Sequence, residues 1–168
     1  MAKGAVVPDT SLLLYLGRIG HLGVLPHLFS EVCVPEQVAF ELDVGRMLRE
    51  DTVNPGTLNW ATIVRVSEEE IDSLPPNQLG AGERSVIAYA RSHTNCTAGL
   101  DDRQARQMAE RIGLAIVGTI GVLIRAKHNG LIGSVRTLLD ACRDEGFRIN
   151  PEVYREALRL AGEGDLIH

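Results

Sequence analysis

Two apolar runs of this 168-residue chain end directly in acidic residues. Asp9 follows the run over residues 5–7, and the pair Asp101-Asp102 follows a second run that ends at Leu100. In an open α/β sheet, ligands bind outside the carboxyl ends of the strands. These three acids are therefore the first candidates for chemistry.

Two further acids lie in segments predicted to be helical. Glu83 opens a helix after Gly80-Ala81-Gly82, and Glu41 lies in the helix that follows the second predicted strand. If the sheet brings these acids near the strand-end acids, two carboxylates about 4 Å apart repel by about 4 kcal/mol at an effective dielectric constant of about 20. A divalent cation removes that cost.

Mg²⁺ and Mn²⁺ prefer oxygen ligands and keep several bound waters, one of which can attack a phosphodiester. An acidic set without a histidine partner thus favours metal-dependent phosphoryl transfer over serine or cysteine chemistry.

Each acid also has a purely structural explanation, which is the commoner one when the residue is taken alone. Asp9, Asp101 and Asp102 could cap the helices that follow them, and Glu83 could complement a helix dipole. Glu41 could lie on a solvated helix face. The combination of position and residue type is what favours a site.

The elements that must position these acids alternate along the chain. Short apolar or β-branched runs predict strands, and longer amphipathic stretches predict helices. We expect strands near residues 5–7, 32–34, 61–66, 97–100 and 114–117, and helices near 11–17, 21–29, 35–48, 83–92, 104–111, 119–128, 134–143 and 151–161. Within the third helix, the spacing predicts an inward face formed by Val38, Leu42, Gly45 and Leu48. Thr119 is expected to be the N-cap of the helix over 119–128.

This alternation predicts a mostly parallel sheet covered on both faces, which is a three-layer α/β/α domain. No linker or repeat divides the chain, so we expect a single domain over residues 1–168 with the C-terminal helices, about 134–161, packed on it.

Composition limits the possible partners. The net charge of −5 removes broad attraction to nucleic acids or anionic membranes, so any nucleic-acid contact must be local. Arg103 and Arg106, one turn past Asp101, are the candidates for touching an RNA phosphate. The chain has no apolar run of transmembrane length and no signal-peptide pattern, and its three cysteines form no C-x-x-C pair. We expect a reducing, cytoplasmic setting without a membrane association.

Five ordered blocks between residues 6 and 163 resemble the PIN-domain family, and in particular its VapC-like prokaryotic branch. The blocks are VVPDTSLLLYLGRIGHL, VCVPEQVAFEL, LGAGERSVIAYA, LDDRQARQMAERIGLAIVGTIGVLIRAKHNGLI and GFRINPEVYREALRLAGE. The resemblance implies a PIN-like fold and a Mg²⁺- or Mn²⁺-dependent endoribonuclease, often the toxin of a toxin–antitoxin pair. It also implies a cognate antitoxin protein and a homodimer as partners, besides the RNA substrate.

The family's acidic residues match Asp9, Glu41, Glu83 and Asp101, and its hydroxyl positions match Thr10 and Ser11. Many family members carry Asp where Glu83 stands here. The order Leu-Asp-Asp leaves open whether Asp101 or Asp102 is the fourth acid, so both are candidate metal ligands.

Two other functions compete with the nuclease. Asp9 is also similar to the nucleophile of haloacid dehalogenase-like phosphatases, but Ser11 stands where that site needs a second Asp. The other alternative is a catalytically degenerate PIN-fold module that binds protein or RNA.

Overall fold

The structure is a computed structural model that describes residues 3–164, and its centre is one parallel β-sheet. The described residues form five strands in the order β3-β2-β1-β4-β5, and every neighbouring pair is parallel. The strands are β1 Ala5–Pro8, β2 Glu31–Pro35, β3 Ala61–Val64, β4 Cys96–Gly99 and β5 Ala115–Val117.

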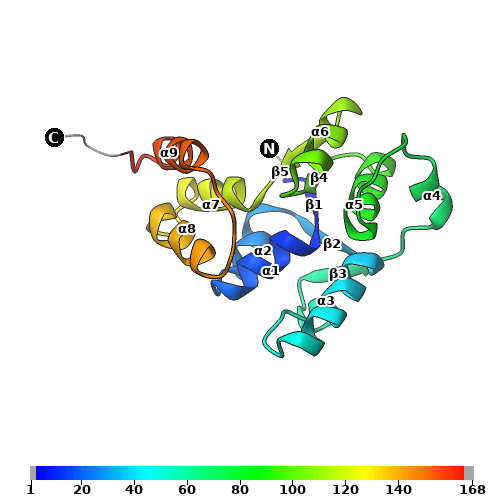
Figure 1. The fold of residues 1–168 in the computed structure, drawn as a ribbon, viewed down its shortest axis with the longest axis horizontal. Helices are drawn as coiled ribbons and strands as arrows, with labels where there is room; N and C mark the ends of the chain where they lie inside the picture. The colour runs from blue at the N-terminus through cyan, green and yellow to red at the C-terminus, as the bar shows by residue number, and fades with distance from the viewer. Residues whose placement is uncertain (1–2, 165–168) are drawn as a thin grey trace.

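Helices follow each strand and cover both faces of the sheet. They are α1 Thr10–Arg18, α2 Leu25–Leu28, α3 Glu36–Leu48, α4 Glu68–Asp72, α5 Ala81–Ser92, α6 Arg103–Arg111, α7 Thr119–His128, α8 Val135–Asp144 and α9 Pro151–Leu160. Figure 1 shows α1, α2 and α7 on one side of the sheet and α5 on the other. Helix α5 contacts β1, β2 and β4, and α6 contacts β5 and α5. The predicted three-layer α/β/α fold is confirmed, with an all-parallel sheet.

The strand order places a topological switch point between β1 and β4. From β1 the chain builds outward through β2 to β3, and it then returns to the other side of β1 for β4 and β5. β1 and β4 are paired in register, with Pro8 opposite Gly99. Asp9 and Asp101 follow these two strands and therefore lie next to each other at the same edge of the sheet.

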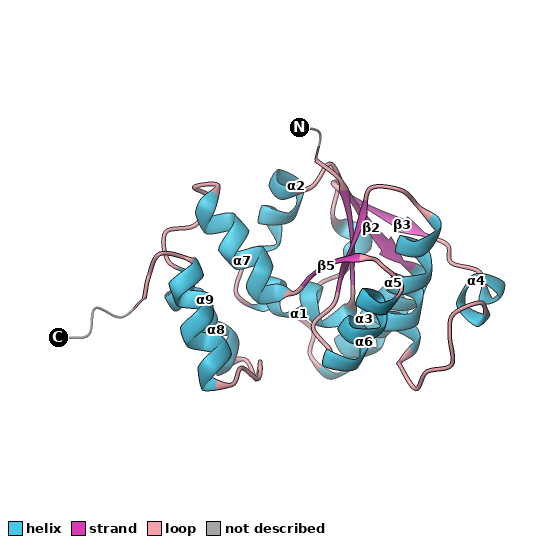
Figure 2. Ribbon diagram, turned by 90° about the horizontal axis from the view of Figure 1, so that it is seen from above, coloured by secondary structure: helices cyan, strands magenta, loops and turns pink. Residues whose placement is uncertain are grey.

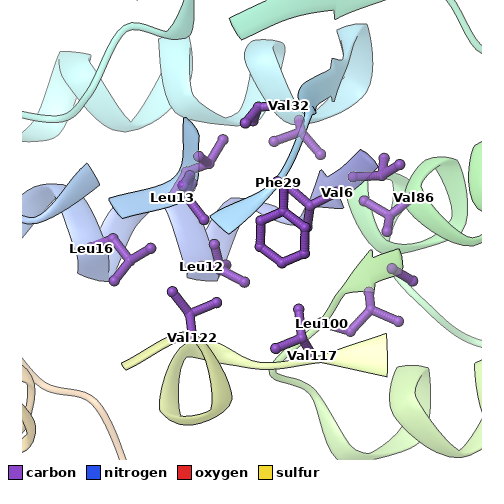
Figure 3. Close-up of a cluster of buried hydrophobic side chains, with 14 of the residues drawn as sticks. Val6, Leu12, Leu13, Leu16, Phe29, Val32, Val86, Leu100, Val117 and Val122 are labelled. Atoms are coloured by element: carbon purple, nitrogen blue, oxygen red, sulfur yellow. The ribbon is translucent and has the colours of Figure 1, made fainter. Parts of the chain in front are cut away.

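The core fills the space between the sheet and the helices. Val6 and Val7 of β1 are fully buried, as are Leu12 and Leu13 of α1. Figure 3 shows Leu12, Val6 and Val122 in one cluster of buried side chains that come from α1, β1 and α7. This packing fixes the direction in which α1 leaves β1, and with it the position of Asp9.

Helices α8 and α9 pack against α7, and α8 also contacts α1. Figure 2 shows this pair lying beyond α7, away from the sheet.

The carboxylate of Glu163, which follows α9, connects this pair to α7. It accepts hydrogen bonds from the backbone N–H of Val135 in α8 at 2.6 Å and from Lys127 Nζ in α7 at 2.9 Å. Burial alone would raise the pKa of Glu163, but these bonds outweigh it and lower the pKa to about 2.

The structure corrects three local expectations. Leu48 was predicted to face inward but is 89% exposed, because the last turn of α3 extends past the sheet. The predicted strand 61–66 is shorter, ends at Val64 and lies at the sheet edge. The short helix α4, capped by Ser67, was not predicted. Within residues 3–164, no helix is both long and apolar enough to cross a membrane.

Candidate active site

Asp9 joins the ends of the two central strands. Its side chain is buried, with the residue 3% exposed. Oδ1 accepts a hydrogen bond from the backbone N–H of Leu12 at 2.8 Å, and Oδ2 accepts one from the backbone N–H of Asp101 at 3.2 Å. Asp9 is therefore the N-cap of α1 and at the same time a link between β1 and β4, so its structural role does not exclude a chemical one.

Asp101 is held by hydroxyl and amide groups from two other elements. Its Oδ1 accepts from the backbone N–H of Thr119 at 2.7 Å. Its Oδ2 accepts from Thr119 Oγ1 at 2.7 Å and from Ser11 Oγ at 2.9 Å. Gly118, and not Thr119 as predicted, is the N-cap of α7. The Thr119 hydroxyl instead donates its hydrogen bond to Asp101, and this bond connects the end of β5 to the end of β4.

Glu41 approaches the same place from α3. Thr10 Oγ1 donates a hydrogen bond to Glu41 Oε1 at 2.7 Å. The start of α5 lies so close that a Cβ atom on Gly82 would be 2.0 Å from Glu41 Oε1. A glycine at position 82 is thus what allows the Glu41 carboxylate to reach its position.

Glu83 and Asp102 complete the acidic set at the starts of α5 and α6. Glu83 Oε1 accepts from the backbone N–H of Gly80 at 3.4 Å, whereas Glu83 Oε2 is buried and receives no hydrogen bond. Asp102 is the N-cap of α6, because it accepts from the backbone N–H of Ala105 at 2.9 Å.

Two of these carboxyl groups have raised pKa values. Burial raises the pKa of Asp9 well above its ordinary value, and the negative charge of Asp101 raises it further. Burial also raises the pKa of Glu83, with added repulsion from Asp102 and Glu41. Asp9 and Glu83 are therefore destabilised in their charged forms by burial and by neighbouring carboxylates, and perturbed carboxyl groups of this kind cluster at functional sites.

All five acids line one cavity of about 580 Å³, called here the acidic cavity. Its lining residues are Asp9, Thr10, Ser11, Leu14, Tyr15, Glu41, Glu83, Asp101, Asp102, Gly146, Phe147 and Arg148. The structure thus brings together every acidic residue that the sequence predicted for the site.

Sequence reasoning missed one wall of the acidic cavity. Gly146, Phe147 and Arg148 come from the connection between α8 and α9, and the Phe147 ring packs edge-on against Tyr15 with centroids 4.9 Å apart. These residues open the block GFRINPEVYREALRLAGE that resembles the family, but their place at the site depends on tertiary packing, which the block does not specify. Thr119 could have been found by applying the strand-end argument to β5.

The predicted substrate-binding residues divide into two groups. Thr10 and Ser11 line the acidic cavity but donate their hydroxyl groups to Glu41 and Asp101, so the structure gives them a positioning role. Arg103 and Arg106 line a neighbouring groove that also includes Asp101. Contact of any of the four with RNA stays a prediction.

The acids fit a divalent cation by their chemistry, although they are not preassembled around one. Across residues 3–164, no group of three or more His, Cys, Asp or Glu side chains is arranged so that it could hold a metal ion. The hydroxyl groups of Ser11, Thr10 and Thr119 occupy oxygens of Asp101 and Glu41. The buried, unpartnered Glu83 Oε2 is nevertheless an oxygen donor that lacks a partner of opposite charge.

The fold and the site together define an α/β domain with an acidic centre at the switch point of a parallel sheet. The chain belongs to the PIN-domain family, since the family described as "DUF3368: PIN domain" matches residues 5–163. PIN domains are generally nucleases, so membership indicates a nuclease-type function. No curated protein matches the chain.

Proposed function

We propose that this protein is a Mg²⁺- or Mn²⁺-dependent endoribonuclease that hydrolyses RNA phosphodiester bonds. The observation that carries the proposal is the convergence of five carboxylates on one cavity at the ends of β1 and β4, with the pKa values of Asp9 and Glu83 raised. Membership of a family of nucleases supports the same reaction class.

Asp9, Glu83 and Asp101 would hold the cation, with Glu41 and Asp102 completing the set. When bound, the ion supplies an activated water and neutralises charge on the phosphate. The chain's own part is positional: Ser11 and Thr119 orient Asp101. Burial of Asp9 excludes water from one side of the cluster, which strengthens its interaction with a cation.

Cleavage of labelled RNA in Mn²⁺, Mg²⁺ and EDTA tests this proposal. We expect cleavage by the wild type with either cation, none in EDTA, and a loss of at least about 100-fold in the Asp9→Asn variant. Glu68→Gln, which removes an exposed carboxylate on α4, is the matched control and should cleave as the wild type does. Equal cleavage by wild type and Asp9→Asn would refute the mechanism.

We propose further that the nuclease is the toxin of a toxin–antitoxin pair, that it works in the cytoplasm as a homodimer, and that a cognate antitoxin protein inhibits it. Expression of the chain alone should arrest growth, and co-expression of the small protein encoded beside it should relieve the arrest. Light scattering should give the mass of a dimer. Growth that continues during expression of active enzyme would contradict the toxin role.

A catalytically degenerate module that binds protein or RNA is the second candidate. The observation that favours it is that the acids of the described chain are not arranged around a ready metal position. Titration calorimetry with Mn²⁺ separates the two functions: the nuclease requires binding at millimolar concentration or tighter, with loss of that binding in Asp9→Asn, whereas the degenerate module requires none.

A further inference from the structure

A second cavity adjoins the acidic cavity and has the opposite electrostatic character. It has a volume of about 670 Å³ and lies between α6, α7 and the segment 147–153; it is called here the arginine groove. Arg103, Arg106, Arg125 and Arg148 line it, against only Asp101 and Glu110 among the acids of its lining. In a chain of net charge −5, this is a local concentration of positive charge.

The charges of these arginines are not neutralised within the described chain. None of the four forms an ion pair with an acid among residues 3–164, and Arg103, Arg125 and Arg148 are exposed. Two of the four make other contacts that carry no opposite charge: Arg106 Nη1 donates to the backbone carbonyl of Leu100 at 2.9 Å, and the Arg125 guanidinium lies over the Phe29 ring, 5.7 Å from its centroid. By contrast, Arg49 and Arg159 are paired with carboxylates elsewhere. The groove therefore holds cationic side chains available to an anionic ligand.

Most of the remaining side chains that line the groove are apolar, and Gln107 and Asn150 add two polar amides. Ile116, Ile120, Ile149 and Val153 contribute apolar surface, together with the ring of Phe147. A lining that combines guanidinium groups with apolar surface matches two parts of an unpaired nucleotide, the charged phosphate and the flat ring face of the base. In a duplex the base faces are stacked inside and could not reach such a surface.

The two cavities adjoin each other and share part of their walls. Asp101, Phe147 and Arg148 line both of them. At the boundary, a Cβ atom on Gly118 would lie 2.9 Å from Asp101 Oδ1 and 2.8 Å from Arg106 Nη1, so the acidic centre and the groove meet at this residue. The opposite flank of the acidic cavity carries Glu41 and Glu83, which would repel phosphates.

We propose that the arginine groove binds the single-stranded nucleic acid next to the scissile phosphate, with Arg103, Arg125 and Arg148 contacting phosphates and the apolar lining receiving a base. This inference rests on the proposed nuclease function and adds a direction to it. The strand leaves the acidic cavity across α6 and α7, and does not pass over α3 and α5.

Binding without catalysis tests the groove by itself. The probe is a fluorescein-labelled ten-residue oligouridylate, followed by fluorescence anisotropy in EDTA at several salt concentrations. The test variant is Arg125→Gln/Arg148→Gln. The matched control is Arg65→Gln/Arg155→Gln, which removes the same charge from two exposed arginines that line neither cavity. Circular dichroism melting checks that both variants remain folded.

We expect the groove variant to bind at least about tenfold more weakly and its slope of log Kd against log salt to fall by about 1.4, since each phosphate contact on a single strand accounts for about 0.7. The control should stay within about twofold of the wild type. Equal weakening in both variants, or no binding by the wild type, would overturn the proposal. So would competition by decaglutamate as effective as that by unlabelled oligouridylate, because it would assign the groove to an acidic peptide.

The same variants separate this inference from the proposed function. Metal-dependent cleavage that survives Arg125→Gln/Arg148→Gln with an unchanged KM supports the nuclease and refutes the groove. Binding that depends on the groove arginines in a protein that cleaves nothing supports the groove and refutes the nuclease.

Discussion

Replacing Asp9 by Asn should make the metal-free protein more stable, although it removes a residue that the proposed activity needs. Asp9 is 3% exposed and lies beside Asp101, so its ionised carboxylate is both desolvated and repelled. Asn keeps the side-chain oxygen that caps α1 through the N–H of Leu12. It removes the charge and leaves the volume of the side chain nearly unchanged.

The size of the effect follows from two opposing contributions. A close pair of carboxylates repels by about 4 kcal/mol at an effective dielectric constant of about 20, and screening reduces this to about 2–4 kcal/mol. The N–H groups of Leu12 and Asp101 point at different oxygens of Asp9, and Asn replaces one of them with an NH2 group that cannot accept, which costs about 1 kcal/mol for the weaker bond at 3.2 Å. The net stabilisation is about 1–3 kcal/mol, or about 3–9 °C in Tm for a chain of this length.

Melting curves in EDTA, followed by circular dichroism, provide the assay. The raised pKa of Asp9 means that the folded state binds its proton more tightly than the unfolded chain does. This contribution to stability is present at low pH and is lost as the pH rises from about 4 through the raised pKa. The difference between Asp9→Asn and wild type should therefore grow over that rise.

Added Mn²⁺ should raise the Tm of the wild type and leave that of Asp9→Asn nearly unchanged. A lower Tm for Asp9→Asn at pH 7 in EDTA would refute the reasoning, since it would mean that Asp9 acts only as a helix cap and strand link.

Two further substitutions test how the acids of the site are positioned, and a third tests what anchors α8 and α9. Gly82→Ala should displace the Glu41 carboxylate, because the new Cβ would lie 2.0 Å from its Oε1. We expect RNA cleavage at least about tenfold slower, with the free energy of unfolding changed by less than about 1 kcal/mol. An unchanged cleavage rate would contradict the role of Glu41. Thr119→Val removes the hydroxyl that donates a hydrogen bond to Asp101. Urea unfolding should show a free energy of unfolding lower by about 1 kcal/mol, and RNA cleavage should be slower. A cleavage rate equal to that of the wild type would show that Asp101 does not need this hydrogen bond. Glu163→Gln should lower the free energy of unfolding by about 1–2 kcal/mol at pH 7. This loss of stability should disappear as the pH falls from about 4 towards about 2, where Glu163 itself is protonated. A loss that does not change with pH would mean that packing, and not charge, anchors α8 and α9.

The order of strands and helices could be predicted from the sequence because apolar runs and amphipathic stretches have distinct periods. The prediction failed where burial depends on distant parts of the chain. Leu48 continues the apolar spacing of α3 but lies 89% exposed, since no other described element covers that end of the helix. Helix α4, Glu68–Asp72, has mostly acidic residues and no apolar period, so only its Ser67 cap could have marked it.

The candidate site was predictable to the extent that it follows strand ends. Asp9 and the pair Asp101-Asp102 follow from that argument, whereas Glu41 and Glu83 lie on predicted helices, so their meeting with the strand-end acids was conditional on the sheet bringing them together, and the resemblance to the PIN-domain family supported it. The hydrogen bonds that distinguish Asp101 from Asp102 are specified by no sequence pattern: Asp102 caps α6, and Asp101 accepts bonds from Ser11 and Thr119. The 146–148 wall reaches the cavity only through the packing of α8 on α1.

The chemistry of the cleaved RNA ends tests the central claim most directly. In the proposed mechanism, the acidic residues would hold a metal ion that supplies an activated water as the nucleophile, whereas metal-free RNA cleavage commonly proceeds through the neighbouring 2′-hydroxyl group and leaves a cyclic phosphate. RNA is therefore cleaved in H₂¹⁸O with Mn²⁺, and the products are analysed by mass spectrometry. We expect one ¹⁸O atom per cleavage and no 2′,3′-cyclic phosphate. In EDTA we expect no cleavage products. Cyclic phosphate ends that form equally in Mn²⁺ and EDTA would contradict the account.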